Sequence, residues 1–140
     1  MRPSVSEQLD GIRAVLAEII SPQITDAYPA DVLAGALATL DMLAASWSSV
    51  PAFLRWDSDA SAAVLALVGE ATPPPPEDVL DLDALIAHQR AVRGALESAM
   101  PVILDDEGAR AAVVLLFRER AARFPMTVRP TGGHGAHAAR

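Results

Sequence analysis

Hydrophobic side chains recur three and four residues apart in five stretches of this chain, and that spacing predicts five helices. The apolar residues are mostly alanine, leucine and valine, which suits closely packed helices better than a β-sandwich, so the chain is predicted to be all-α. The predicted helices cover residues 5–20, 29–48, 58–69, 79–99 and 106–124.

The first predicted helix has clear signals at both ends. Ser4 and Glu7 have the spacing of a capping box, in which each side chain bonds the backbone N–H of the other residue. Pro22 then ends the helix, because the residue before a proline is driven out of the helical conformation.

The second predicted helix contains the run ADVLAGALATLDMLAASW, which has almost no polar face. Its leucine-rich side is expected in the core. The opposite side carries Gly35, Ala38 and Met42, which predicts contact with a sister helix or with another chain. Asp31 and Asp41 leave too few uninterrupted apolar residues for a membrane span of about 20 residues. We therefore expect protein on both sides of this helix, and no membrane.

Two segments lack helical periodicity. Residues 70–78, EATPPPPED, contain four consecutive prolines, which favour a stiff extended spacer. Residues 126–140 are rich in glycine and are expected to form a flexible tail. The predicted organisation is one helical bundle over residues 1–125, with the spacer inside it, followed by the tail.

Composition narrows the fold and the classes of function. The chain has 140 residues, of which 51% are hydrophobic and only 4% aromatic, and this favours an all-α, single-domain bundle of about five helices. The net charge of −7 argues against a nucleic-acid surface. The chain has no cysteine, which excludes disulfides and fits a reducing cytoplasm, and its start lacks the apolar core of a signal peptide. We expect a cytoplasmic protein.

The aromatic residues are concentrated in one segment, PAFLRWD, which holds Phe53 and Trp56. Together with Trp47 and His88 they are candidates for lining an apolar ligand pocket. The alternative is that the aromatic rings close one end of the bundle. His88 is also the only histidine in a segment predicted to be ordered, so any acid–base chemistry would depend on it.

Neither of the two clusters of potential ligands predicts a metal site. Asp105, Asp106 and Glu107 lie at the start of the fifth helix and are expected to cap it, since no calcium-loop spacing follows. His134 and His137 supply only two ligands. The sequence contains no nucleotide-binding loop or zinc-protease motif, so we expect no metal and no cofactor.

Arg118, Arg120 and Arg123 lie in the last turns of the fifth helix. They complement the negative end of the helix dipole there. The same arginines could instead hold an anionic ligand or an acidic patch on a partner protein.

Residues 5–44 resemble the start of small all-helical bacterial proteins of unknown function that accompany aminoglycoside-phosphotransferase-like kinases and acyl-CoA dehydrogenases. The residues that carry the resemblance are Leu9, Ile12, Leu16, Pro22 and the apolar run 33–43. The resemblance implies a role beside such an enzyme, and it assigns no functional residue.

Three classes of function follow. We expect a non-catalytic interaction protein, either a homodimer or an accessory subunit of a larger enzyme. The alternatives are a helical bundle that binds a hydrophobic small molecule near Phe53 and Trp56, and an enzyme that uses His88 as its base.

Overall fold

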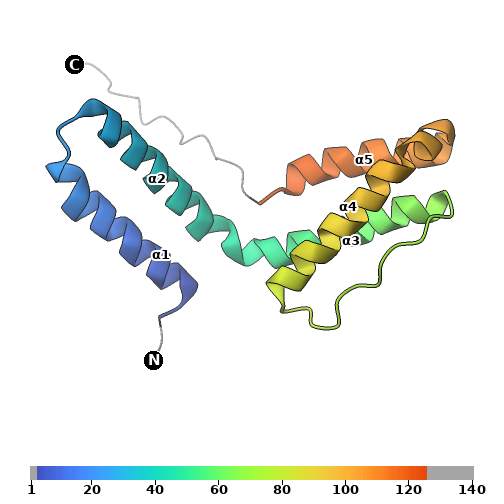
Figure 1. Ribbon diagram of the computed structural model, residues 1–140, viewed down its shortest axis with the longest axis horizontal. Coiled ribbons are helices and arrows are strands. Elements are labelled where there is room, and N and C mark those ends of the chain that lie inside the picture. The colour runs from blue at the N-terminus through green and yellow to red at the C-terminus, as the bar shows by residue number, and fades with distance from the viewer. Residues whose placement is uncertain (1–2, 126–140) are drawn as a thin grey trace, which may run out of the picture. The chain divides into compact units, whose positions relative to one another are not determined.

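The computed structural model describes residues 3–125, and every regular element in that range is helical (Figure 1). The all-α prediction is confirmed for these residues. In chain order the elements are α1 (Val5–Ala14), the π-helical η1 (Val15–Ile20), the 3-10 turn η2 (Ser21–Gln23), α2 (Ala27–Ser46), the 3-10 turn η3 (Trp47–Ser49), α3 (Val50–Leu67), α4 (Leu82–Asp105) and α5 (Glu107–Arg123). The predicted tail, residues 126–140, lies outside the described residues.

The second and third predicted helices are one continuous helical segment. α2 passes through η3 directly into α3, so the described residues form four helical segments rather than five. The sequence predicts a break around Pro51 and a helix that starts only at residue 58. That prediction is wrong because a proline in the first turn of a helix gives up no intrahelical hydrogen bond, and α3 begins at Val50.

α4 is longer than predicted because it continues through Pro101 to Asp105. A proline inside a helix removes a backbone hydrogen bond and costs about 3 kcal/mol. The turns on either side of Pro101 bury Ala99 and Ile103, whose exposed fractions are 5% and 0%. Their burial in the core keeps the final turns helical, so the predicted end at residue 99 is wrong.

The C-terminal unit, Ser46–Pro125, has its own hydrophobic core, which α3, α4 and α5 build together. The proline-rich segment connects α3 to α4 (Figure 1). Gly69 follows α3 with a φ of 75°, a left-handed conformation that glycine adopts without strain. The core side chains are Val64, Leu65, Val92, Leu96, Ala99, Ile103, Ala109, Val113 and Leu116.

The N-terminal unit, described for residues 3–45, holds α1, η1, η2 and nearly all of α2. The predicted capping box is present: the Ser4 N–H donates to Glu7 Oε2 at 2.6 Å, and the Glu7 N–H donates to Ser4 Oγ at 3.2 Å. Arg13 on α1 forms an ion pair with Asp41 on α2.

No side chain in residues 3–45 is buried. The leucines that the sequence assigns to the core of the bundle are only half-buried in this unit; they are Leu9, Leu16, Leu33, Leu37 and Leu40. The prediction of a single-domain bundle is therefore wrong, because α3, α4 and α5 complete a core without these leucines and the chain divides into two compact units.

The continuous segment Ala27–Leu67 is long and apolar enough to meet the length and composition criteria for a membrane span, with a window of mean hydropathy 1.2. Core helices of soluble proteins and signal sequences meet the same criteria. Only 6% of that window is buried.

Candidate functional site

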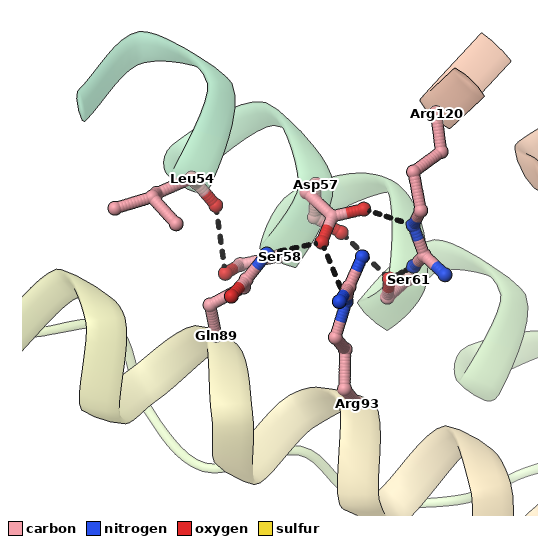
Figure 2. A network of polar contacts seen from close by, with 7 residues as sticks. All are labelled: Leu54, Asp57, Ser58, Ser61, Gln89, Arg93 and Arg120. Carbon is pink, nitrogen blue, oxygen red and sulfur yellow. Dashed lines mark hydrogen bonds and ion pairs between the residues drawn. The ribbon is translucent and has the colours of Figure 1, made fainter. Parts of the chain in front are cut away.

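A fully buried carboxylate lies at the centre of the C-terminal unit. Asp57 on α3 has an exposed fraction of 0%, and side chains from α4 and α5 donate to both of its oxygens (Figure 2). Oδ2 accepts from Gln89 Nε2 at 2.7 Å and from Arg93 Nε at 3.1 Å, while Oδ1 accepts from Arg120 Nε at 2.5 Å. One side chain therefore links the three helices of this unit.

Local sequence spacing explains how these donors converge. Gln89 and Arg93 are four residues apart on α4, so their side chains extend from the same face of the helix. Ser61 lies one turn after Asp57 on α3, and its hydroxyl donates to the Asp57 carbonyl oxygen at 2.6 Å. The same hydroxyl oxygen accepts from Arg120 Nη2 at 3.0 Å, which fixes the second edge of that guanidinium.

The network is electrically unbalanced, with one carboxylate between two guanidinium groups. Arg120 is the inner arginine, with 14% of its side chain exposed, and Arg93 is the outer one, with 40% exposed. Moving a charge out of water is costly unless it is paired and hydrogen-bonded, and Asp57 meets both conditions. Because both of its oxygens are occupied and neither reaches solvent, Asp57 is in a position to hold helices together and not to touch a ligand.

Sequence reasoning missed this network. For the predicted helix that starts at residue 58, Asp57 or Ser58 would be the cap, whereas in the structure Asp57 lies in the second turn of α3. The available signal is the spacing of Asp57, Ser58 and Ser61, which places three polar side chains on one side of a helix that begins before them. Ser58 satisfies its hydroxyl by donating to the Leu54 carbonyl oxygen at 2.9 Å.

The structure brings two of the four pocket candidates together. Phe53 is 8% exposed, and its ring lies 5.9 Å from that of Trp56 and 5.5 Å, edge-on, from that of Phe124. The Arg123 guanidinium lies over the Trp56 ring, 4.5 Å from its centre. These side chains pack on one another where the sequence predicts a ligand.

The other two pocket candidates lie on different elements. Trp47 is in η3 with 37% of its surface exposed, and His88 is half-buried on α4. A surface depression of about 340 Å³ does lie along α4, but it is mostly polar. Its lining residues are Ile86, Gln89, Arg90, Arg93, Gly94 and Glu97.

The three terminal arginines of α5 have separate roles rather than one shared site. Arg120 belongs to the Asp57 network, Arg123 covers Trp56 and pairs with Glu119 at 3.3 Å, and Arg118 is exposed.

Asp106 caps α5 as predicted by accepting from the Ala109 N–H at 2.7 Å. Among residues 3–125 no group of three or more candidate metal ligands is found.

The predicted interface residues all lie on α2. Gly35 and Ala38 are exposed and Met42 is half-buried. A β-carbon added at Gly35 would meet no atom within 4 Å, so the space beside this glycine is open.

No family model, curated protein or solved structure matches this chain.

Proposed function

We propose that this protein is a non-catalytic interaction protein that binds another polypeptide through its N-terminal helices, either as a homodimer or as an accessory subunit of a larger enzyme. The observation that carries the proposal is the contrast between the two units. Residues 3–45 have an apolar composition and no buried side chain, whereas the C-terminal unit has a complete core.

The N-terminal unit leaves large apolar side chains exposed without burying any in a core of its own. Seven large hydrophobic side chains in residues 3–45 are between 40% and 80% exposed: Val5, Ile12, Val15, Ile19, Ile20, Tyr28 and Val32. Each apolar Å² left in water forfeits about 25 cal/mol of stabilisation. Val5, Ile12, Val15 and Ile19 recur seven, three and four residues apart along α1 and η1, and exposed apolar residues aligned on one side of a helix are typical of a surface that a partner covers.

The chemistry of the C-terminal unit fits a binding role better than catalysis. Its buried carboxylate is saturated by donors, and its aromatic residues pack on one another. The alternative of an apolar ligand near Phe53 and Trp56 has less support, because Phe124 packs edge-on with Phe53 and Arg123 lies over the Trp56 ring.

Hydrogen exchange read by mass spectrometry tests the proposal. In the dilute isolated chain we expect the amides of α1 and α2 to exchange far faster than those of α4, because few buried contacts protect them. A homodimer predicts that raising the chain concentration slows their exchange, and an accessory subunit predicts fast exchange until the partner enzyme is added. Slow exchange of α1 and α2 in a monomer at every concentration would contradict the proposal.

A further inference from the structure

The exposed apolar side chains of α1 and η1 follow the spacing of a helix-packing seam. The seam consists of Val5, Gln8, Ile12, Val15 and Ile19, which are three and four residues apart and all exposed. Four of the five are β-branched hydrophobic residues. A repeat of this kind places side chains along one line of a helix, where they fit into spaces on a neighbouring helix.

α2 carries a second seam with the same spacing and smaller side chains. It consists of Tyr28, Val32, Gly35, Thr39 and Met42, four and three residues apart in alternation. The Thr39 hydroxyl donates to the Gly35 carbonyl oxygen at 2.9 Å, so its hydrogen-bonding need is met inside the helix. Burial of Thr39 would therefore leave no orphaned hydroxyl at the middle of this seam.

The two seams are complementary in size, and neither carries a charge that would oppose their contact. Ile12 and Val15 at the middle of the first seam are bulky, whereas Gly35 and Thr39 at the middle of the second are small, so one seam can fit closely into the other. Neither seam contains an ionisable group other than the phenol of Tyr28. Gly35 has open space beside it, which a closely approaching helix would use. Such a use would account for a glycine at a position inside a helix where alanine is more favourable.

We propose that a second copy of this chain covers both seams, with α1 of each copy packed on α2 of the other. This proposal rests on the proposed function and names its partner. A two-fold arrangement pairs each seam with its complement on the partner copy and leaves none uncovered. The product is a four-helix bundle made from two N-terminal units.

The dimensions allow an interface at the small end of the range for specific complexes. Residues 5–20 span roughly 24 Å as a helix and α2 roughly 30 Å, and each helix is about 10 Å wide. The two helices of one copy therefore present roughly 540 Å², against the roughly 800 Å² per partner that a standard-size interface buries.

An anionic membrane is a poorer occupant of the same surface. Residues 3–45 carry six carboxylates, at positions 7, 10, 18, 26, 31 and 41, against the single guanidinium of Arg13. This excess of negative charge repels anionic lipid headgroups.

Light scattering with matched variants of the full chain tests the pairing. We expect twice the chain mass of 14.7 kDa at micromolar concentration. Ile12→Glu and Gly35→Leu should each raise the dissociation constant of the dimer by about tenfold or more.

The controls are Leu115→Glu and Gly94→Leu, since Leu115 is 53% exposed on α5 and Gly94 has the same open space on α4. Both controls should remain dimeric, and circular dichroism should show native helix content in all four variants.

Cross-linking identifies which helices meet. The chain has no cysteine, so single substitutions give an unambiguous disulfide. Ile12 and Gly35 lie near the middle of their seams and come close in either relative direction of the two helices. A mixture of Ile12→Cys and Gly35→Cys chains should therefore form the mixed disulfide faster than either forms its own. A mixture of Ile12→Cys and Gly94→Cys chains should not.

Several results would overturn the pairing. These are a monomeric native chain, a dimer that Ile12→Glu and Gly35→Leu leave intact, dissociation by Leu115→Glu instead, and cross-links only between identical positions. A monomer that sediments with vesicles containing phosphatidylserine would identify a membrane as the occupant. A monomer whose α1 and α2 exchange rapidly would overturn self-pairing and leave the proposed function standing, whereas a monomer with slow exchange would overturn both.

Discussion

Asp57 is the residue on which the packing of the C-terminal unit depends most. It is fully buried and accepts hydrogen bonds from Gln89, Arg93 and Arg120, which lie 32, 36 and 63 residues further along the chain. Removing its charge leaves two guanidinium groups facing each other without an anion between them. Loss of the anion lowers the free energy of unfolding by more than the intact network contributes to it, because the remaining guanidinium groups keep their desolvation penalty.

We therefore predict that Asp57→Asn lowers the free energy of unfolding by about 3–5 kcal/mol. Urea denaturation followed by circular dichroism measures this. Asp59→Asn is the matched control, since Asp59 is exposed on the same helix and its substitution should change stability by less than about 0.5 kcal/mol. Equal effects of the two substitutions would contradict a special role for Asp57.

This network marks the limit of what the sequence could predict at the residue scale. A polar run in an apolar stretch resembles a helix start, because caps and buried networks use the same residue types. The choice between them depends on partners on other helices, and the sequence contains no signal that connects Asp57 with Arg120. The caps made by Ser4 and Asp106 were predictable because each interacts with backbone only three residues away.

Among the helices, α1 is expected to respond to pH at its N-terminal end, where Glu7 completes the capping box. Hydrogen bonds with Ser4 hold the pKa of the Glu7 carboxyl below its ordinary value. The bond with the Ser4 backbone N–H has the larger effect, and the bond with the Ser4 hydroxyl has the smaller one. A carboxyl whose pKa is lowered by folding stabilises the folded state at pH values above the ordinary pKa of the carboxyl. This stabilisation is lost as the pH falls through the lowered pKa.

We predict that the first turn of α1 frays on acidification through this range, which amide chemical shifts of the first turn would detect. Glu7→Gln is the control, because glutamine completes a capping box without titrating. Its first turn should show no such transition. A transition of equal size in Glu7→Gln would assign the effect to another group.

Pro101 makes α4 less stable than its length suggests. It lies inside the helix and is exposed, so alanine fits there without a clash and restores one backbone N–H. We predict that Pro101→Ala raises the free energy of unfolding by up to about 3 kcal/mol in thermal or urea denaturation. Pro51→Ala, in the first turn of α3, should have little effect. A loss of stability in Pro101→Ala would show that the proline shapes a bend which the core requires.

A comparison of the prolines shows which helix ends could be predicted from the sequence. The four prolines of the spacer follow the end of α3, and there the sequence prediction holds. At Pro22 it is wrong in part: η1 ends at Ile20, but Ser21 keeps helical angles (φ −54°, ψ −42°) and Pro22 lies inside the 3-10 turn η2, because a proline near the start of a helical turn gives up no intrahelical hydrogen bond. Pro51 and Pro101 have the same local signature but lie within continuous helical segments. Pro51 does not end the helical segment because it lies in the first turn of α3. Pro101 does not end α4 because the turns beside it bury Ala99 and Ile103. Neither reason is apparent from the proline itself.

Across the whole molecule, the two units differ in what stabilises them. The C-terminal unit has a shared core and a polar network that joins three helices. In the N-terminal unit, the Arg13–Asp41 ion pair connects α1 with α2, and the leucines of both helices are only half-buried. Apolar periodicity predicted helix in each of these regions, but it could not predict which helices find partners within the chain.

The absence of any buried side chain in residues 3–45 has a consequence for the lifetime of the protein in a cell. A segment that is folded mainly in its bound form is stabilised by mass action, in proportion to the concentration of whatever binds it. Chains without a partner would expose cleavable backbone in α1 and α2, and proteases would remove them first. The amount of this protein would then follow the amount of its partner without any dedicated regulator.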